Sequence, residues 1–225
     1  MSTRRDFKRA LALALLSLIC SVTLGSAVAN ATQIRISEIF TNPDGTDDGK
    51  TFIELFGPAG ESLSGYTVEG VNGGTGAVYL TVDLSAFSIP LDGIFVAADS
   101  SSGTTSVPEA DALFASLDPQ NGPDSIRLLM GGVVVDAIGY GAFTSAVFAG
   151  EGSPAPLPPS GSSLARLFAN VDTDDNLADF VLLEAPTPGT APLMNTATVP
   201  EPASLLLLGA ALLPLNARMR GKGIR

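Results

Sequence analysis

The stretch Gln33-Ile-Arg-Ile-Ser-Glu-Ile-Phe40 decides the fold class, because it is a short apolar run that stops at turn residues. The turn-rich stretch Asn42-Pro-Asp-Gly-Thr-Asp-Asp-Gly49 follows, and a second apolar run, Thr51-Phe-Ile-Glu-Leu-Phe56, comes next. Strands this short and frequent predict an all-β sandwich or barrel. The same pattern predicts further strands at residues 65–71, 77–84, 93–98, 125–130, 133–140, 163–168 and 179–183.

Two features interrupt this run of strands. Met130-Gly131-Gly132-Val133 predicts a tight hairpin turn, since glycine adopts positive φ without a steric cost. Residues 108–117 predict a short helix. The middle of the chain, about 170 residues, is long enough for one hydrophobic core.

Several short motifs occur along residues 34–189: Ile36-Ser37-Glu38-Ile39, Phe52-Ile53-Glu54-Leu55, Leu63-Ser64-Gly65-Tyr66, Asp136-Ala137-Ile138-Gly139-Tyr140-Gly141, Gly161-Ser162-Ser163-Leu164-Ala165-Arg166, Asp172-Thr173-Asp174-Asp175-Asn176 and Thr187-Pro188-Gly189. In this order they resemble the successive markers of the lamin-tail domain family. The resemblance implies an immunoglobulin-like β-sandwich over residues 30–190. Tyr66 stands where the family usually has tryptophan, and residues 67–124 carry no marker.

The N-terminus has the order of a secretory signal: basic residues, the apolar run 10–24, then small residues. Ala27 and Ala29 fit the −3 and −1 positions of a signal peptidase site, so we expect residues 1–29 to be a signal helix that is removed. Cleavage after Ala31 and a retained signal anchor are the alternatives. Thr3-Arg4-Arg5-Asp6-Phe7 also resembles a twin-arginine signal, which leaves two export routes open.

The C-terminus has three parts in order. Val199-Pro200-Glu201-Pro202 comes first, an apolar segment at 203–217 forms a short predicted helix, and Arg218-Met219-Arg220-Gly221-Lys222 closes the chain. The apolar segment is too short to be a good permanent membrane anchor. This tail, residues 199–225, resembles the PEP-CTERM sorting signal of Gram-negative bacteria that make exopolysaccharide. Residues 191–198 would be a linker.

The resemblance of the tail implies processing by an exosortase, a membrane-embedded transpeptidase, near the Pro-Glu-Pro triplet. It also implies transient anchoring in the inner membrane and a final place at the cell envelope, the outer surface or the extracellular matrix. The expected partners are therefore signal peptidase and an exosortase, together with exopolysaccharide or other surface proteins.

Charge is segregated along the chain. All of the 23 acidic residues except Asp6 and Glu201 lie in residues 30–199, where the basic residues are only Arg35, Lys50, Arg127 and Arg166. The middle segment therefore carries a formal charge of −17, although the whole chain carries −11. Such a domain repels phosphate backbones, so nucleic-acid binding is disfavoured.

The inventory of catalytic residues is small. The chain has no histidine, and its one cysteine, Cys20, lies in the signal segment. Sites of the Ser-His-Asp or Cys-His type are therefore excluded, as is an ordinary structural zinc site. No phosphate-binding glycine loop is present, and no tryptophan is available to stack on a sugar. The sequence predicts that the protein is not an enzyme and that it needs no cofactor.

Two sets of polar residues are candidates for a site. Asp172, Asp174 and Asn176 place oxygens at alternating positions, which is the ligand type that calcium prefers, although Leu177 and Leu183 exclude an EF-hand. A solvated turn is the alternative reading, and the same holds for the acidic turn with Asp44, Asp47 and Asp48.

Glu38 and Glu54 lie in apolar strands, where a buried carboxylate needs a partner. Arg166 is the expected one, in a structural ion pair.

Together these features predict an exported, non-catalytic β-sandwich module of the cell surface or matrix. Two alternatives stay open: an accessory domain of a secreted metal-dependent hydrolase or nuclease system, and a calcium-binding structural protein.

Overall fold

The computed structural model describes residues 33–144 and 147–190, which form two β-sheets and one short helix. The strands alternate with turns along the chain, as the short apolar runs of the sequence require. The elements are β1 (Arg35–Phe40), β2 (Phe52–Phe56), β3 (Tyr66–Asn72), β4 (Val78–Asp83), β5 (Ile94–Asp99), β6 (Ala112–Phe114), β7 (Asp124–Met130), β8 (Val133–Tyr140), β9 (Ser163–Arg166), α2 (Asn176–Asp179) and β10 (Phe180–Leu183).

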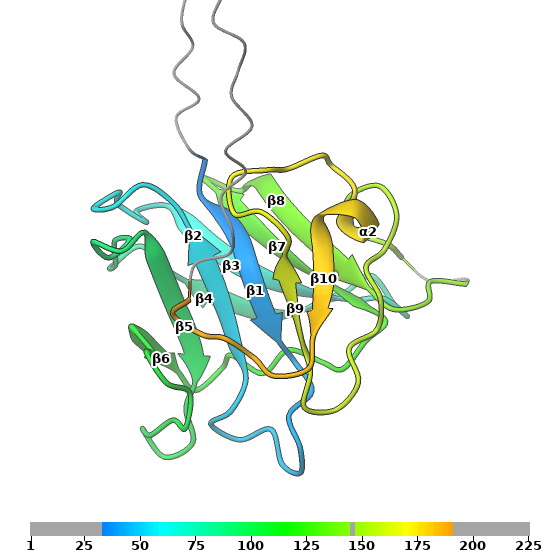
Figure 1. Ribbon diagram of the computed structural model, residues 1–225, viewed down its shortest axis with the longest axis horizontal. Helices are drawn as coiled ribbons and strands as arrows, with labels where there is room; N and C mark the ends of the chain where they lie inside the picture. The colour runs from blue at the N-terminus through cyan, green and yellow to red at the C-terminus, as the bar shows by residue number, and fades with distance from the viewer. Residues whose placement is uncertain (1–32, 145–146, 191–225) are drawn as a thin grey trace, which may run out of the picture. The chain divides into compact units, whose positions relative to one another are not determined.

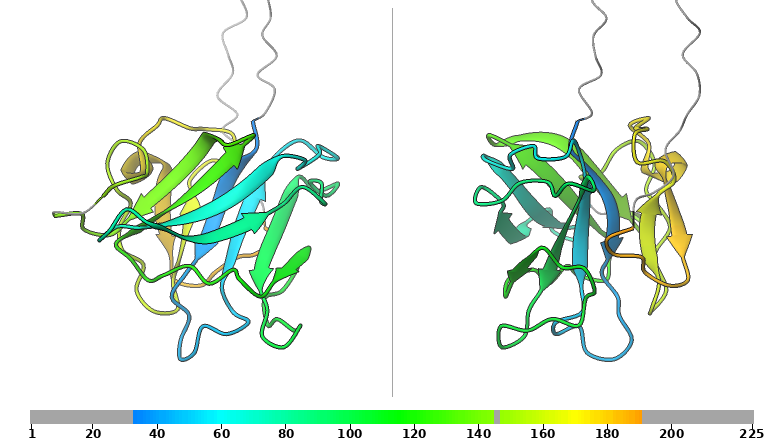
Figure 2. Two further views of the ribbon diagram at one scale, coloured as in Figure 1. Left: turned by 180° about the vertical axis from the view of Figure 1, so that it is seen from behind. Right: turned by 60° about the vertical axis from the view of Figure 1, so that its left-hand side comes forward.

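The two sheets pack face to face as an all-β sandwich (Figures 1 and 2). The six-stranded sheet has the order β10-β9-β1-β2-β5-β6, and the four-stranded sheet has the order β4-β3-β7-β8. Neighbouring strands are antiparallel except for β5 and β6, which are parallel. The sequence prediction of an all-β fold is confirmed.

The main core lies between the sheets. Alternate residues of β1 and β2 point into it, so that Ile39 and Ile53 are fully buried against side chains such as Leu128 of β7 and Ile138 of β8. Burying such side chains is the principal gain in free energy on folding, about 1.5–3 kcal/mol each. Tyr140 of β8 is also fully buried in this core.

A second, smaller core covers the opposite face of the six-stranded sheet. Phe52, Val96 and Ala98 point outward from β2 and β5, and Val107 of the loop after β5 packs onto them. Because both faces of β5 are covered, every residue of that strand is buried. The six-stranded sheet is therefore the middle layer of this part of the molecule, and buried polar groups on its outer face need internal partners.

The nine strands predicted from the sequence all occur, with ends that differ by no more than two residues. The predicted helix at residues 108–117 is wrong, because this stretch contains β6. Asp111 holds it beside β5: its backbone N–H donates to the Val96 carbonyl at 2.9 Å, and its carboxylate accepts from the Val96 N–H at 2.8 Å. Pairing with a neighbouring strand thus overrides the local helical preference.

The predicted hairpin turn is confirmed. Met130 pairs with Val133, and both glycines between them have positive φ, +59° at Gly131 and +81° at Gly132. These values belong to the tight turns that match the twist of two antiparallel strands.

Other sequence predictions fall outside the described residues. They are the signal segment with Ala27 and Ala29, the linker at 191–198, and the tail with Val199, Pro200, Glu201 and Pro202. The chain divides into two units, one of which is Asn30–Asn195. Within the described ranges, no helix has the length and apolar character needed to cross a membrane.

Candidate functional site

A buried arginine organises the most polar region inside the sandwich. Arg166 ends β9, and its side chain is fully buried. Its Nη2 donates to both carboxylate oxygens of Asp136, at 2.9 and 3.1 Å, while its Nη1 donates to Asp179 at 3.2 Å and to Asp172 at 3.4 Å. Its Nε donates to the Ile36 carbonyl at 3.1 Å. Such charge-assisted bonds are the strong class of hydrogen bond.

The network joins elements that are far apart in the sequence. Asp136 belongs to β8 of the four-stranded sheet, and Arg166 belongs to the six-stranded sheet. Asp136 also accepts a hydrogen bond from the Ile36 N–H at 2.6 Å. The Arg166 guanidinium carbon lies 4.6 Å from the centroid of the Phe180 ring, which belongs to β10. The ion pairs therefore link the two sheets directly.

The expected pairing of Arg166 with Glu38 or Glu54 is wrong. Both glutamates are buried in strands as predicted, but each accepts a hydrogen bond from a serine: Ser163 donates to Glu38 at 2.6 Å, and Ser37 donates to Glu54 at 2.7 Å. The physical reason is the face of the sheet on which each side chain lies. The two glutamates lie on the outer face of the six-stranded sheet, beside the smaller core, whereas the carboxylates that bind Arg166 come from Asp136 of β8 and from residues 172 and 179.

The candidate calcium ligands have three different roles. Asp172 is paired with Arg35, at 3.2 Å, and with Arg166. Asp174 is exposed, with φ +55°. Asn176 is buried and begins α2. Its amide oxygen accepts from the N–H groups of residues 139 and 151, at 2.8 and 2.9 Å, and its amide nitrogen donates to the carbonyl of residue 137 at 2.7 Å. Asn176 therefore bridges backbone segments.

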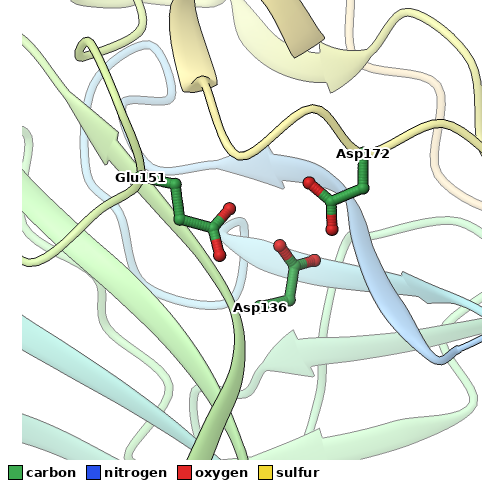
Figure 3. Close-up of side chains that lie close together, drawn as sticks. All are labelled: Asp136, Glu151 and Asp172. Atoms are coloured by element: carbon green, nitrogen blue, oxygen red, sulfur yellow. The ribbon is translucent and has the colours of Figure 1, made fainter.

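Three carboxylates nevertheless converge beside the arginine (Figure 3). Asp136, Glu151 and Asp172 each present an oxygen, and these oxygens lie within 4.8 Å of one another. Both oxygens of Asp136 and of Asp172 accept hydrogen bonds from arginine or backbone groups. The Oε2 atom of Glu151 is buried and has no hydrogen-bond partner among the described residues.

Burial is the main cause that raises the pKa of Glu151 to about 8, and the charges of Asp136 and Asp172 raise it further. Glu151 is therefore protonated over much of the neutral range. No sequence pattern pointed to Glu151, because it lies in the irregular connection between β8 and β9, where no periodic pattern marks burial. Asp136 was more visible, as an acidic residue within an apolar strand.

A pocket of about 420 Å³ opens on the outer side of the six-stranded sheet. Its lining is mostly apolar, with the charged groups of Asp44 and Lys50 among it. The Lys50 ammonium donates to the Asp44 carbonyl at 2.8 Å. The lining comes from β1, β2 and the loop between them, from the loop after β5, from the connection before β9 and from the segment after β10. The lining residues are Phe40, Pro43, Asp44, Lys50, Phe52, Ser106, Val107, Pro108, Gly161, Pro186 and Pro188.

The few basic residues of the domain are used internally. Arg35 pairs with Asp172, Arg127 pairs with Glu69, and Arg166 is buried among aspartates. The acidic residues are far more numerous, so the surface of the described domain has strongly negative charge. Such a surface would repel phosphate backbones, and the absence of nucleic-acid binding stays a prediction.

The chain matches no protein-family model, no curated protein and no solved structure.

Replacing Arg166 tests how much this side chain contributes to the free energy of unfolding. Arg166→Met keeps much of the side-chain volume but leaves Asp136 buried without its cation, so we expect the free energy of unfolding to fall by about 3–5 kcal/mol. Arg127→Met is the matched control, because the partly exposed pair of Arg127 and Glu69 contributes about 0–1 kcal/mol. Urea denaturation measures both. Equal losses in the two variants would contradict the central role of Arg166.

The buried glutamates predict a dependence of stability on pH. Burial raises the pKa of Glu54 to about 7 and that of Glu151 to about 8, above the ordinary value of 4.5. The folded state then binds these protons more tightly than the unfolded state, so stability falls as pH rises from about 4.5 to 8. For Glu54 the loss is about 3 kcal/mol.

Glu54→Gln mimics the neutral acid and should flatten this decline, as measured by urea denaturation at pH 5, 6.5 and 8. Glu61→Gln, the same change at an exposed position, should leave the slope as it is. A wild-type stability that rises across this range would refute the assignment.

Proposed function

We propose that this chain is an exported, non-catalytic surface or matrix module whose lamin-tail-like, immunoglobulin-like sandwich is sorted and processed by an exosortase at Val199-Pro200-Glu201-Pro202. The observation that carries the proposal is one folded acidic domain that lies between two terminal sequences with the order of sorting signals. Basic residues flank both apolar terminal segments, and the domain between them holds its own basic residues in internal bonds.

The state of the carboxylates supports a non-catalytic role. A hydrolase that uses two carboxylates needs both of them open to the substrate. Glu38 and Glu54 are 1% and 0% exposed, and their oxygens bond to serines of the sheet and to the segment after β10. Asp136 and Asp179 are bound to Arg166. These groups serve to hold the fold.

The proposed partners follow from the tails and the surface. Signal peptidase and an exosortase act on the ends, and the domain then contacts exopolysaccharide or other surface proteins. A pocket with an apolar lining and two charged groups, such as the one between Lys50 and Pro188, is of the size and character that small-molecule sites have. The domain would act through such surfaces as an adhesion or scaffold module.

Replacing the triplet tests the sorting proposal. Substituting Pro200, Glu201 and Pro202 together by alanine keeps the apolar segment and the basic end, so membrane insertion is preserved while recognition by the transpeptidase is lost. We expect the variant to accumulate in the inner-membrane fraction, and the wild type to appear at the surface or in the medium. Replacing Thr196 and Thr198 by alanine in the linker is the control. Equal fractionation of wild type and triplet variant in cells with an active exosortase would reject the proposal.

A second candidate, a calcium-dependent structural module, is favoured by the unpartnered buried oxygen of Glu151 beside Asp136 and Asp172. Calcium takes six to eight oxygen ligands, and Arg166 and Arg35 already occupy the aspartates. The residues therefore fit calcium only in part.

Calcium titration tests this second candidate. With calcium at a hundred times its dissociation constant, binding would stabilise the folded state by about 2.7 kcal/mol and raise the melting temperature by several degrees. The rise should disappear in Glu151→Gln. A melting temperature that 5 mM calcium leaves unchanged at pH 8 would remove this candidate.

A further inference from the structure

The last described segment of the chain forms a tight turn. Residues Thr187-Pro188-Gly189-Thr190 close it with a hydrogen bond from the Thr190 N–H to the Thr187 carbonyl at 3.0 Å. Pro188 occupies the second position, and Gly189, with φ +74°, occupies the third. This is the residue pattern of a type II turn, in which the third position requires positive φ.

Two buried glutamates face this turn from the sheet. Glu38 of β1 and Glu54 of β2 are register partners on neighbouring strands, and they lie 1% and 0% exposed. Neighbouring residues of both strands, such as Ile39 and Ile53, belong to the core between the sheets. The glutamates therefore point to the outer face, where the segment after β10 crosses the sheet.

The turn donates three hydrogen bonds to the two carboxylates. The Thr187 N–H donates to Glu38 Oε1 at 2.9 Å, and the Thr187 hydroxyl donates to Glu38 Oε2 at 2.7 Å. The Gly189 N–H donates to Glu54 Oε2 at 2.8 Å. Together with the bonds from Ser37 and Ser163, every oxygen of the two carboxylates has a donor.

The turn and the glutamates depend on each other. A buried carboxylate that loses its donors carries a desolvation cost of 1–3 kcal/mol or more, so the carboxylates resist any departure of the turn. The turn also fits closely against the loop after β5, because a Cβ atom at position 189 would lie only 2.6 Å from the Glu109 Cβ. Only glycine can take this place, both for its φ and for the contact.

We propose that Glu38 and Glu54 form a carboxylate clamp that fixes the turn Thr187–Thr190 on the sheet and thereby sets the point at which the sorting tail leaves the folded domain. This inference rests on the proposed function, since it assigns the clamp a role in processing. The clamp holds residues 187–190 in a hydrogen-bonded turn on the sheet, and a protease needs an extended chain, so these residues are not cut before the sorting motif is processed.

The clamp also sets how many residues of the sequence separate the last described contact of the domain from the motif. Val199 follows Gly189 by ten residues, and ten residues span at most about 35 Å when fully extended. Without the clamp, the last strand pairing among the described residues would be the end of β10 at Leu183, six residues before Gly189. The released residues would add a stretch of chain that proteases can cut upstream of the motif, which would shed the domain before the transpeptidase acts.

The test uses the full-length protein and two kinds of variant. Thr187→Val removes the hydroxyl donor from the turn without touching the sheet, and Thr187→Ser restores it. The double variant Glu38→Ala with Glu54→Ala removes the clamp from the sheet side. Thr190→Val, in the same turn, is the matched control.

Hydrogen exchange is measured on the purified chains. In the peptide that contains residues 184–190, exchange should become about tenfold faster in Thr187→Val, and faster still in the double variant. Exchange in the β7 peptide shows whether the sandwich stays folded.

The same variants are then expressed in the native cells, and the C-termini of the exported products are determined by mass spectrometry. We expect products that end between residues 184 and 190 to increase several-fold in Thr187→Val and in the double variant, and to stay at the wild-type level in Thr187→Ser and Thr190→Val. Unchanged exchange in Thr187→Val and in the double variant would refute the clamp itself.

Faster exchange with an unchanged set of C-termini would refute the role in processing while the proposed function stands, provided that the triplet variant still fails to be sorted. If wild type and triplet variant were sorted alike, both the role of the clamp in processing and the proposed function would be overturned.

Discussion

The ion pairs between Arg166 and its three aspartates are the constraint on which the rest of the sandwich depends. A buried guanidinium loses its hydration, and only several well-placed carboxylates and carbonyls offset that cost. Asp136 supplies two of these bonds from the four-stranded sheet, while Asp172 and Asp179 approach from the segment before β10. Phe180 covers the guanidinium from β10. The two sheets and the C-terminal part of the domain are therefore held in one arrangement, because any other leaves charges buried without partners.

The same use of carboxylates recurs in the loops. Asp99 accepts a hydrogen bond from the Gly49 N–H at 2.6 Å, and Asp124 accepts one from the Gly73 N–H at 2.6 Å. The only cysteine of the chain is Cys20, so no disulfide is available to restrain these loops. Buried acidic side chains take that role here, and the clamp on the C-terminal turn is the most developed case. The strongly acidic composition thus serves the inside of the domain as well as its surface.

The sequence predicted the strands well because each buried strand carries a local pattern of apolar residues between turn residues. It failed for β6, whose pairing with β5 is a tertiary contact, and for the partners of Arg166. Glu38 and Glu54 were correctly predicted to lie in buried strands, yet neither pairs with Arg166, because both side chains lie on the outer face of the six-stranded sheet. Asn176 and Glu151 show the same limit, since their partners come from distant backbone segments and from an irregular connection. Position within an apolar strand revealed that Glu38 and Glu54 are buried, and only the fold revealed what they bind.

The folded domain and the two terminal sequences lead to one proposal, that the chain is exported and its product is the sandwich trimmed at both ends. Intact mass spectrometry with terminal sequencing of the protein from its native cells measures this directly. An N-terminus at Asn30 and a C-terminus within residues 199–202 are predicted. A product that keeps both Met1 and Arg225 would contradict the claim.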